Sequence, residues 1–185
     1  MVPYGLVTDG SAGQVAAFGS LPIDSLWVGG HVASPGPTPE AMVLLARLSA
    51  LAQRVRIGTS ILLLPLYPPA IAAKQIADID RACGSRVTIG VGVGGEYPAE
   101  FSACGVPLSE RGSRADETIG LLRQLWTAEP TSHHGRHFHF DDVRIHPTPA
   151  QSGDRPIIVA GRQPAAMRRA ALLGDGWMPY LYSPL

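Results

Sequence analysis

The feature that most constrains the fold is a repeated alternation of short apolar segments with longer amphipathic ones. The apolar segments are predicted strands at residues 4–7, 25–28, 56–62, 87–93, 157–160 and 176–178. Between them, apolar residues recur every three or four positions, as at Leu44, Leu48 and Leu51, which is typical of helices with one buried face. Apolar strands separated by such helices predict a parallel sheet whose faces are covered by helices.

Six such strand–helix units leave two architectures open. A (β/α)8 barrel usually needs at least about 200 residues, whereas this chain has 185. A doubly wound open sheet suits that length better, and the pattern alone does not choose between the two. The hydrophobic fraction of 45% is sufficient for a packed core.

Composition excludes several classes of function. The formal net charge is zero, so the chain lacks the basic surface of a nucleic-acid-binding protein. It contains no apolar run of about 18 residues that would span a membrane, and Met1 to Gly10 lack the features of a secretion signal. Cys83 and Cys104 are expected to be free thiols, which favours a cytoplasmic location.

The segment 131–149 departs from the alternation. It contains five of the six histidines and alternates polar with aromatic residues, which predicts an excursion with hairpin character. His137 and His139 would share one face of a strand, but no carboxylate or thiol stands at a recognised metal-ligand spacing. We therefore predict no metal site.

Local signals also predict how several residues are placed. Thr38 is the expected N-cap of a helix that starts at Pro39, and Gly174 is expected to end a helix in the left-handed conformation. Asp78 and Asp80 are expected to be solvated, and Trp126 is expected to lie in the core.

Four blocks carry a resemblance to a known family. They are DSLWVGGH at 24–31, RIGTSIL at 56–62, RVTIGVGVGGE at 86–96 and GDGW at 174–177. In this order and spacing they resemble the luciferase-like monooxygenase family, and within it the branch that uses coenzyme F420. The resemblance implies a TIM-barrel-like (β/α)8 fold that is incomplete, with residues 1–185 forming a single partial barrel domain of about six units.

The resemblance also implies an activity. We expect an F420-dependent oxidoreductase that transfers hydride to or from a small organic substrate. Two alternatives stay open: an FMN-dependent monooxygenase of the same fold, and a truncated, non-catalytic remnant. A barrel that does not close would leave strand edges unpaired, so we also expect the chain to form a homo-oligomer.

Site residues of such barrels lie at strand ends and in the loops that follow. By the resemblance, His31 is the acid, base or electrostatic partner beside the flavin-like ring, and Glu96 is an acid on the substrate side. A bulge at Ser60–Ile61, often with a non-prolyl cis peptide, would press on the back of the ring. The expected cofactor-binding residues are Thr59, Ser60, Ile61, Gly92, Val93, Gly94, Gly95, Gly161, Arg162 and Gln163.

Elementary chemistry supports part of this set. Glycines such as Gly94 let a cofactor approach the backbone, whose N–H groups meet anionic oxygens. Gly161 to Gln163 precede a predicted helix, whose amino end favours phosphate. One residue departs from the family pattern, because the position before His31 is usually acidic and is here Gly30. A hydrogen-bond acceptor for His31 is therefore missing from its usual place.

Overall fold

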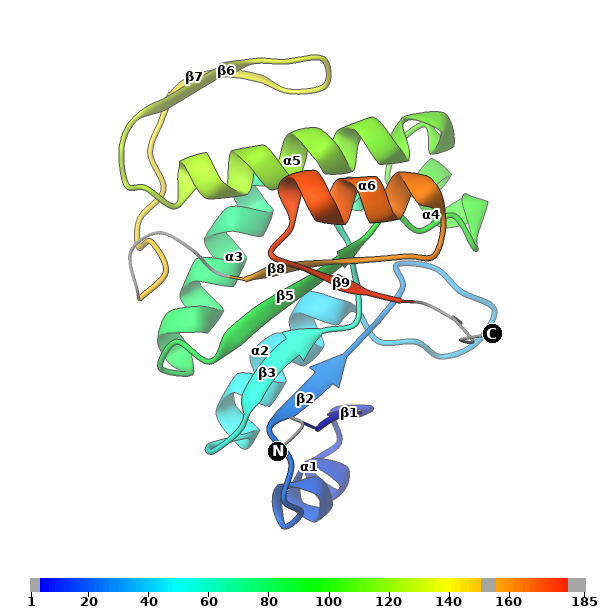
Figure 1. Cartoon of the computed structure of the whole chain (residues 1–185), viewed down its shortest axis with the longest axis vertical. Coiled ribbons are helices and arrows are strands. Elements are labelled where there is room, and N and C mark those ends of the chain that lie inside the picture. Colours follow the sequence, from blue (N-terminus) through cyan, green and yellow to red (C-terminus); the bar gives the residue numbers. More distant parts are fainter. Residues whose placement is uncertain (1–3, 151–155, 180–185) are drawn as a thin grey trace.

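The computed structural model describes residues 4–150 and 156–179. Its central sheet has seven parallel strands, and six of them lie side by side in sequence order. They are β1 (Gly5–Val7), β2 (Ser25–Val28), β3 (Arg56–Thr59), β5 (Val87–Gly92), β8 (Ile157–Ala160) and β9 (Gly176–Met178). The order never reverses, which rules out a doubly wound sheet. The predicted barrel-like sheet is therefore confirmed (Figure 1).

Helices follow most strands and cover one face of the sheet. They are α1 (Ala12–Gly19), α2 (Ala41–Leu51), α3 (Pro69–Ala82), α4 (Pro98–Ala103), α5 (Arg111–Leu125) and α6 (Pro164–Leu173), with short 3-10 turns η1 (Leu64–Leu66) and η2 (Leu108–Glu110). Alternate strand residues such as Leu26 and Ile57 are fully buried in the same core as Leu45 and Leu48 of α2. None of the helices in the described ranges is long and apolar enough to cross a membrane.

The other face of the sheet is only partly covered. Trp27 stands there, in register with Val7 on one side and Gly58 on the other. A Cβ on Gly58 would lie 2.6 Å from the Trp27 ring, so glycine makes room for the indole. Val7 on this face is 65% exposed.

Two predictions about helix ends are wrong. Glu40, rather than Thr38, caps α2, because its carboxylate accepts from the Met42 and Val43 N–H groups at 3.0 and 2.8 Å. Gly174 is extended, with φ −97°, rather than left-handed. Its Cβ would lie 2.9 Å from Val159 Cγ2, so close packing, not φ, requires glycine there.

The predictions for Trp126 and for the cysteines are confirmed, whereas the prediction for Asp80 is wrong. Trp126 lies in the core as predicted and donates to the Ala73 carbonyl at 3.0 Å. Asp80 is fully buried rather than solvated and accepts from the Ala150 N–H at 3.0 Å. Cys83 and Cys104 are free thiols.

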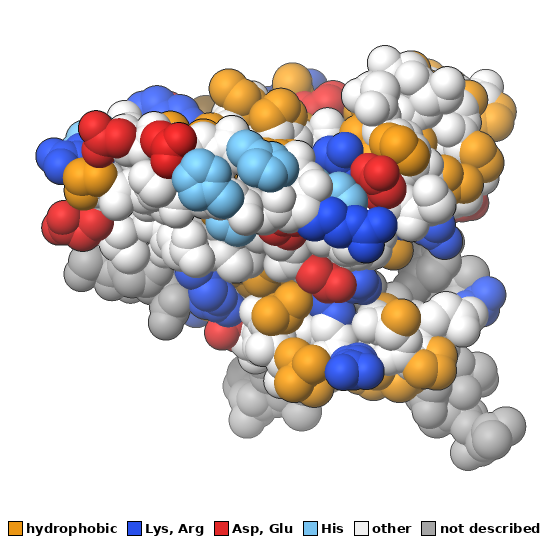
Figure 2. All heavy atoms as spheres, turned by 90° about the horizontal axis from the view of Figure 1, so that it is seen from above, with side chains coloured by type: hydrophobic (Ala, Val, Ile, Leu, Met, Phe, Trp, Pro, Cys, Tyr) orange, Lys and Arg blue, Asp and Glu red, His pale blue; other side chains and the backbone are white. Residues whose placement is uncertain are grey.

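An antiparallel hairpin, β6 (Thr131–His134) with β7 (His139–Val143), lies along α5 (Figure 1). Glu117 of α5 accepts from the His133 ring at 2.8 Å and from the Phe138 N–H at 3.1 Å. The His137 ring contacts Ser113 Oγ at 2.8 Å. Figure 2 shows histidines gathered with acidic and basic side chains on the face seen from above. His133 and His137 thus hold the hairpin on α5.

Glu117 makes this attachment sensitive to acid. Burial raises the pKa of its carboxyl, but the hydrogen bonds from His133 and from the backbone of His137 and Phe138 outweigh burial, and the pKa is lowered. A depressed pKa means that the stabilisation is complete above the usual pKa of 4.5 and is lost as the pH falls through the folded value. Glu117→Gln should cost about 1–3 kcal/mol of unfolding free energy at neutral pH.

Urea unfolding between neutral pH and about pH 3.5 measures this effect. The stabilities of wild type and Glu117→Gln should converge as the pH falls. Glu129→Gln is the matched control, since Glu129 is exposed. A constant gap between Glu117→Gln and wild type at every pH would contradict the expectation.

Candidate functional site

The predicted site residues lie at one end of the sheet. His31 follows β2, Ser60 and Ile61 follow β3, Gly94 and Gly95 follow β5, and Gly161 to Gln163 follow β8. Because all these strands are parallel, their carboxyl ends meet at the same edge (Figure 1). This is the end at which barrels of this kind place their sites.

Ser60 and Ile61 interrupt the strand that the sequence predicted over 56–62. β3 ends at Thr59, whose hydroxyl donates to the Gly90 carbonyl at 2.7 Å, and β4 (Leu62–Leu63) pairs with β5 farther along. The expected bulge and non-prolyl cis peptide between Ser60 and Ile61 are present. The two residues therefore leave the regular ladder at the carboxyl end of the sheet.

Two glycines make room for this bulge. A Cβ on Gly29 would lie 2.5 Å from the Ser60 carbonyl oxygen, and one on Gly92 would lie 1.9 Å from Ile61 Cδ1. The Ser60 hydroxyl also reaches the Met178 sulfur, at 3.4 Å. Gly29 after β2, Gly92 of β5 and Met178 of β9 thus converge on Ser60–Ile61.

The glycine run after β5 borders a cationic side chain. Gly94 and Gly95 have φ of 62° and 114°, values that favour glycine. A Cβ on Gly95 would lie 3.1 Å from Arg111 Nε. That nitrogen is buried and has no hydrogen-bond partner among the described residues, although Arg111 Nη1 donates to Leu108 at 2.8 Å. A buried, unsatisfied guanidinium N–H beside open backbone is suited to an anionic oxygen.

The turn after β8 presents a second group of donors. Gly161 has φ 137° and is held by the Met178 carbonyl at 3.1 Å and by the Trp177 indole at 2.7 Å. Arg162 and Gln163 are exposed, and Gln163 caps α6 without a side-chain hydrogen bond. The first N–H groups of α6 are therefore not capped by that side chain.

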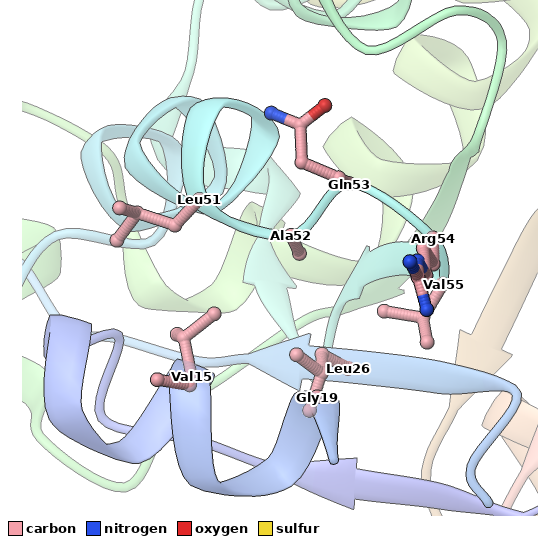
Figure 3. A pocket seen from close by; sticks show the side chains of 9 residues that line it. Val15, Gly19, Leu26, Leu51, Ala52, Gln53, Arg54 and Val55 are labelled. Atoms are coloured by element: carbon pink, nitrogen blue, oxygen red, sulfur yellow. The ribbon is translucent and has the colours of Figure 1, made fainter.

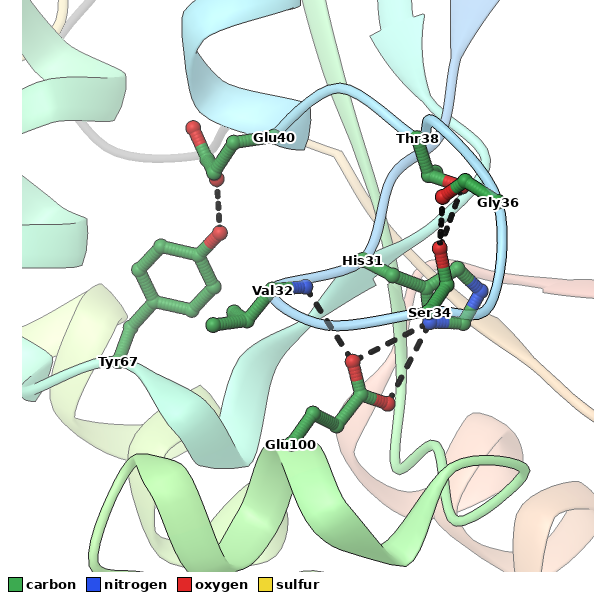
Figure 4. Close-up of polar contacts among 8 residues, drawn as sticks. All are labelled: His31, Val32, Ser34, Gly36, Thr38, Glu40, Tyr67 and Glu100. Atoms are coloured by element: carbon green, nitrogen blue, oxygen red, sulfur yellow. Dashed lines mark hydrogen bonds and ion pairs between the residues drawn. The ribbon is translucent and has the colours of Figure 1, made fainter.

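His31 is paired with a carboxylate that the sequence interpretation did not single out. Its Nδ1 lies 3.2 and 3.4 Å from the two oxygens of Glu100, which also accepts from the Val32 N–H at 3.3 Å (Figure 4). Glu100 is fully buried, whereas the His31 side chain is 24% exposed. The Tyr97 ring meets the His31 ring edge-on, with centroids 4.8 Å apart.

Glu96, the predicted substrate-side acid, is not part of this pair. It is exposed, and no hydrogen bond or ion pair joins it to any residue in the described ranges. Glu100 stands four residues later on α4, a helix that the sequence interpretation omitted. Pro98 at the first position of that helix was the available signal.

Hydrogen bonds also hold the other end of the loop between His31 and Glu40. The Tyr67 hydroxyl donates to Glu40, and Ser34 donates to Thr38 at 2.7 Å (Figure 4). Burial, together with the hydrogen bond and charge of Glu40, raises the pKa of the Tyr67 hydroxyl well above its ordinary value. The Tyr67 hydroxyl is therefore a donor at neutral pH.

Gly30 is enclosed by the backbone of the same loop. A Cβ there would lie 2.1 Å from the Pro39 carbonyl oxygen and 2.7 Å from the Ala41 nitrogen. No side chain fits without moving the backbone, so the acidic residue usual at this position has no space.

A separate pocket lies at the opposite, amino end of the strands (Figure 3). It is lined mainly by apolar residues of α1 and the end of α2, including Val15, Leu26, Leu51 and Val55, with Arg54 at its side. It contains none of the predicted site residues, so we do not include it in the candidate site.

Two curated relatives differ in cofactor. The F420-dependent glucose-6-phosphate dehydrogenase of Kineococcus radiotolerans is 31% identical over 164 residues, which are 84% of this chain and 48% of the relative. The FMNH(2)-dependent dimethylsulfone monooxygenase of Pseudomonas putida is 34% identical over 139 residues, 74% of this chain and 38% of the relative. The chain thus spans about half the length or less of these relatives.

The fold is also found in a solved structure. An F420-dependent secondary alcohol dehydrogenase in complex with an F420–acetone adduct superposes with a TM-score of 0.79, at 23% identity, over 96% of this chain and 57% of that one. The family model described as luciferase-like monooxygenase matches residues 12–185. With the sheet order and the strand-end residues, this match shows that the chain belongs to the luciferase-like monooxygenase family.

Proposed function

We propose that this chain forms the cofactor-binding end of an F420-dependent oxidoreductase, which transfers hydride to or from a small organic substrate. The observation that carries the proposal is the placement of Ser60–Ile61 between Gly29 and Gly92, at the strand end that His31 also follows. A flat ring needs such a backbone wall on one face and a proton-handling group near its reacting atom.

The residues present fit a phosphorylated flavin-like cofactor. F420, when bound, supplies the hydride chemistry, while the protein supplies position and electrostatics. Thr59, Ser60 and Ile61 would form the wall behind the ring. Gly92 to Gly95 with Arg111, and Gly161 to Gln163, would bind anionic oxygens through the unsatisfied Arg111 Nε–H and through the exposed Arg162 and Gln163 that precede α6.

His31 is the proposed proton partner of the substrate, and Glu96 stays a proposal as a substrate-side acid. Glu96 is exposed at the same end of the sheet as His31, so a bound substrate would have to bring the two groups into one site. The F420 branch is favoured because the four sequence blocks resemble it and because the Kineococcus relative is named F420-dependent.

A second candidate, an FMN-dependent monooxygenase, is favoured by the Pseudomonas putida relative. The donors around Arg111 suit the FMN phosphate equally well. The third candidate, a non-catalytic remnant, is distinguished from the other two by binding neither cofactor. The three candidates make different predictions for cofactor binding.

Parallel titrations of the chain with F420 and FMN, followed by fluorescence, separate these candidates. We expect F420 to bind more tightly than FMN. Tighter binding of FMN would favour the monooxygenase, and binding of neither cofactor would favour the remnant; either result contradicts the proposal.

Gly94→Ala should weaken F420 binding at least about tenfold, which is 1.4 kcal/mol. Its Cβ would lie 3.1 Å from Leu63 and 3.3 Å from Phe101 at φ 62°, which would displace the loop that meets the cofactor. The matched control is Gly84→Ala, at φ 69° with open space around the added Cβ. Both variants carry the same backbone cost, so equal affinities in the two would show that the Gly94 loop does not contact F420.

A further inference from the structure

We propose that Glu100 is the positioning residue of His31: it keeps the proton on Nδ1 and leaves Nε2 as the nitrogen that exchanges a proton with a ligand. This inference rests on the proposed function for its catalytic meaning. Its structural content, the tautomer of His31, can be tested without a cofactor.

The hydrogen bonds of Glu100 fix the direction of the contact. Its carboxylate is fully buried, and its partners are the His31 ring and the Val32 N–H. When Glu100 is ionised its carboxylate only accepts, and the proposal is that the His31 nitrogen facing it donates. In a neutral imidazole the other nitrogen, Nε2, then carries the lone pair. Nε2 has no hydrogen-bond partner within residues 4–150 and 156–179.

The Glu100 side chain is held by hydrogen bonds alone. No lysine or arginine in the described part of the chain forms an ion pair with it. A buried carboxylate without a cation is costly unless it is hydrogen-bonded. The Nδ1–H of His31 and the N–H of Val32 supply those bonds, which ties the position of the ring to the first residues of the loop.

The first turn of α4 and the residue before it contact the His31 ring from two directions. Tyr97 is the N-cap residue that precedes α4, and Glu100 stands three residues later in its first turn. Tyr97 meets the His31 ring edge-on at 4.8 Å, while Glu100 binds its Nδ1. The two contacts together restrain the orientation of the His31 ring. Hydrogen-bonded partners orient catalytic and metal-binding histidines in other proteins in the same way.

Gly30 and Glu100 are complementary parts of this arrangement. The acid usual at position 30 has no space, because its Cβ would lie 2.1 Å from the Pro39 carbonyl oxygen. Glu100 reaches His31 from α4 instead, 69 residues along the chain from it. The departure at Gly30 therefore does not leave His31 without an acceptor.

The test is the tautomer of His31 in the ligand-free, full-length chain, read from its ring ¹⁵N chemical shifts, with His31→Asn used to assign the signals. Wild type should show the proton on Nδ1. Glu100→Gln, whose amide oxygen still accepts, should keep that tautomer. Glu100→Leu, which has a similar volume and no acceptor, should move His31 toward the Nε2–H form.

Glu117→Leu is the matched control, because Glu117 holds His133 as Glu100 holds His31. It should change the signals of His133 and leave those of His31 unchanged. In F420 turnover, Glu100→Leu should lower kcat by about 100-fold or more, the scale of general acid–base catalysis. Glu100→Gln should fall between Glu100→Leu and wild type.

Two results would overturn the proposal: an Nε2–H tautomer in wild type, or an unchanged tautomer in a folded Glu100→Leu. If Glu100→Leu does not fold, the wild-type and Glu100→Gln spectra still decide. A chain that binds no F420 but shows the predicted tautomers would refute the proposed function and leave the role of Glu100 intact.

Discussion

Replacing Gly30 by aspartate is expected to destabilise the protein by roughly 3 kcal/mol or more, the upper range for overpacking a site. The substitution would put back the acidic residue that the family pattern leads one to expect beside His31. Its Cβ, however, would lie 2.1 Å from the Pro39 carbonyl oxygen and 2.7 Å from the Ala41 nitrogen. Both are backbone atoms, so relief requires moving the start of α2.

Urea unfolding of Gly30→Asp and of Gly36→Asp measures this effect. Gly36 lies in the same loop, and a Cβ there meets nothing within 4 Å. Gly36→Asp therefore adds the same charge without the collision. Its unfolding free energy should stay within about 0.5 kcal/mol of wild type, as is usual for surface substitutions. Equal stabilities of the two variants would show that the loop around Gly30 is free to rearrange.

The purified 185-residue chain is expected to self-associate or to melt at low temperature. Among the described residues, β1 and β9 each pair with a strand on one side only, and unpaired edges with apolar side chains are an association hazard. Val7 is 65% and Trp177 40% exposed. At about 25 cal/mol per Å², several uncovered side chains of this size amount to several kcal/mol, comparable with a domain stability of about 5–15 kcal/mol.

Light scattering and thermal melting of Val7→Lys test this expectation. A lysine on an edge strand opposes pairing with another edge, so the variant should shift the chain strongly toward monomer. Val43→Lys is the matched control, because Val43 is 66% exposed but lies on α2. A wild-type monomer with a melting temperature well above about 65 °C would show that six strands suffice.

The parallel sheet and the strand-end blocks were predictable because their signals are local. Each strand is a short apolar run, and the glycines and Ser60–Ile61 stand at fixed offsets from a strand end. Gly58 is an example, because any larger residue there would collide with the Trp27 ring. Backbone requirements of this kind remain visible in a single sequence.

What could not be predicted depends on contacts between distant residues. Glu100 binds His31 across 69 residues, and Asp80 binds Ala150 across 70. Both carboxylates stand on helices where a solvated position is the ordinary expectation. The cap of α2 failed for another reason, because Thr38 is a favoured N-cap residue but the Glu40 carboxylate binds the helix N–H groups itself.

A crystal structure of the chain with F420 tests the central claim most directly. We predict that the deazaflavin ring lies against Ser60–Ile61, with His31 Nε2 turned toward its reacting face and a phosphate oxygen within hydrogen-bond distance of Arg111 Nε. A ring bound elsewhere, such as in the pocket between α1 and α2, or a site in which Ser60–Ile61 and His31 make no contact with F420, would contradict the account.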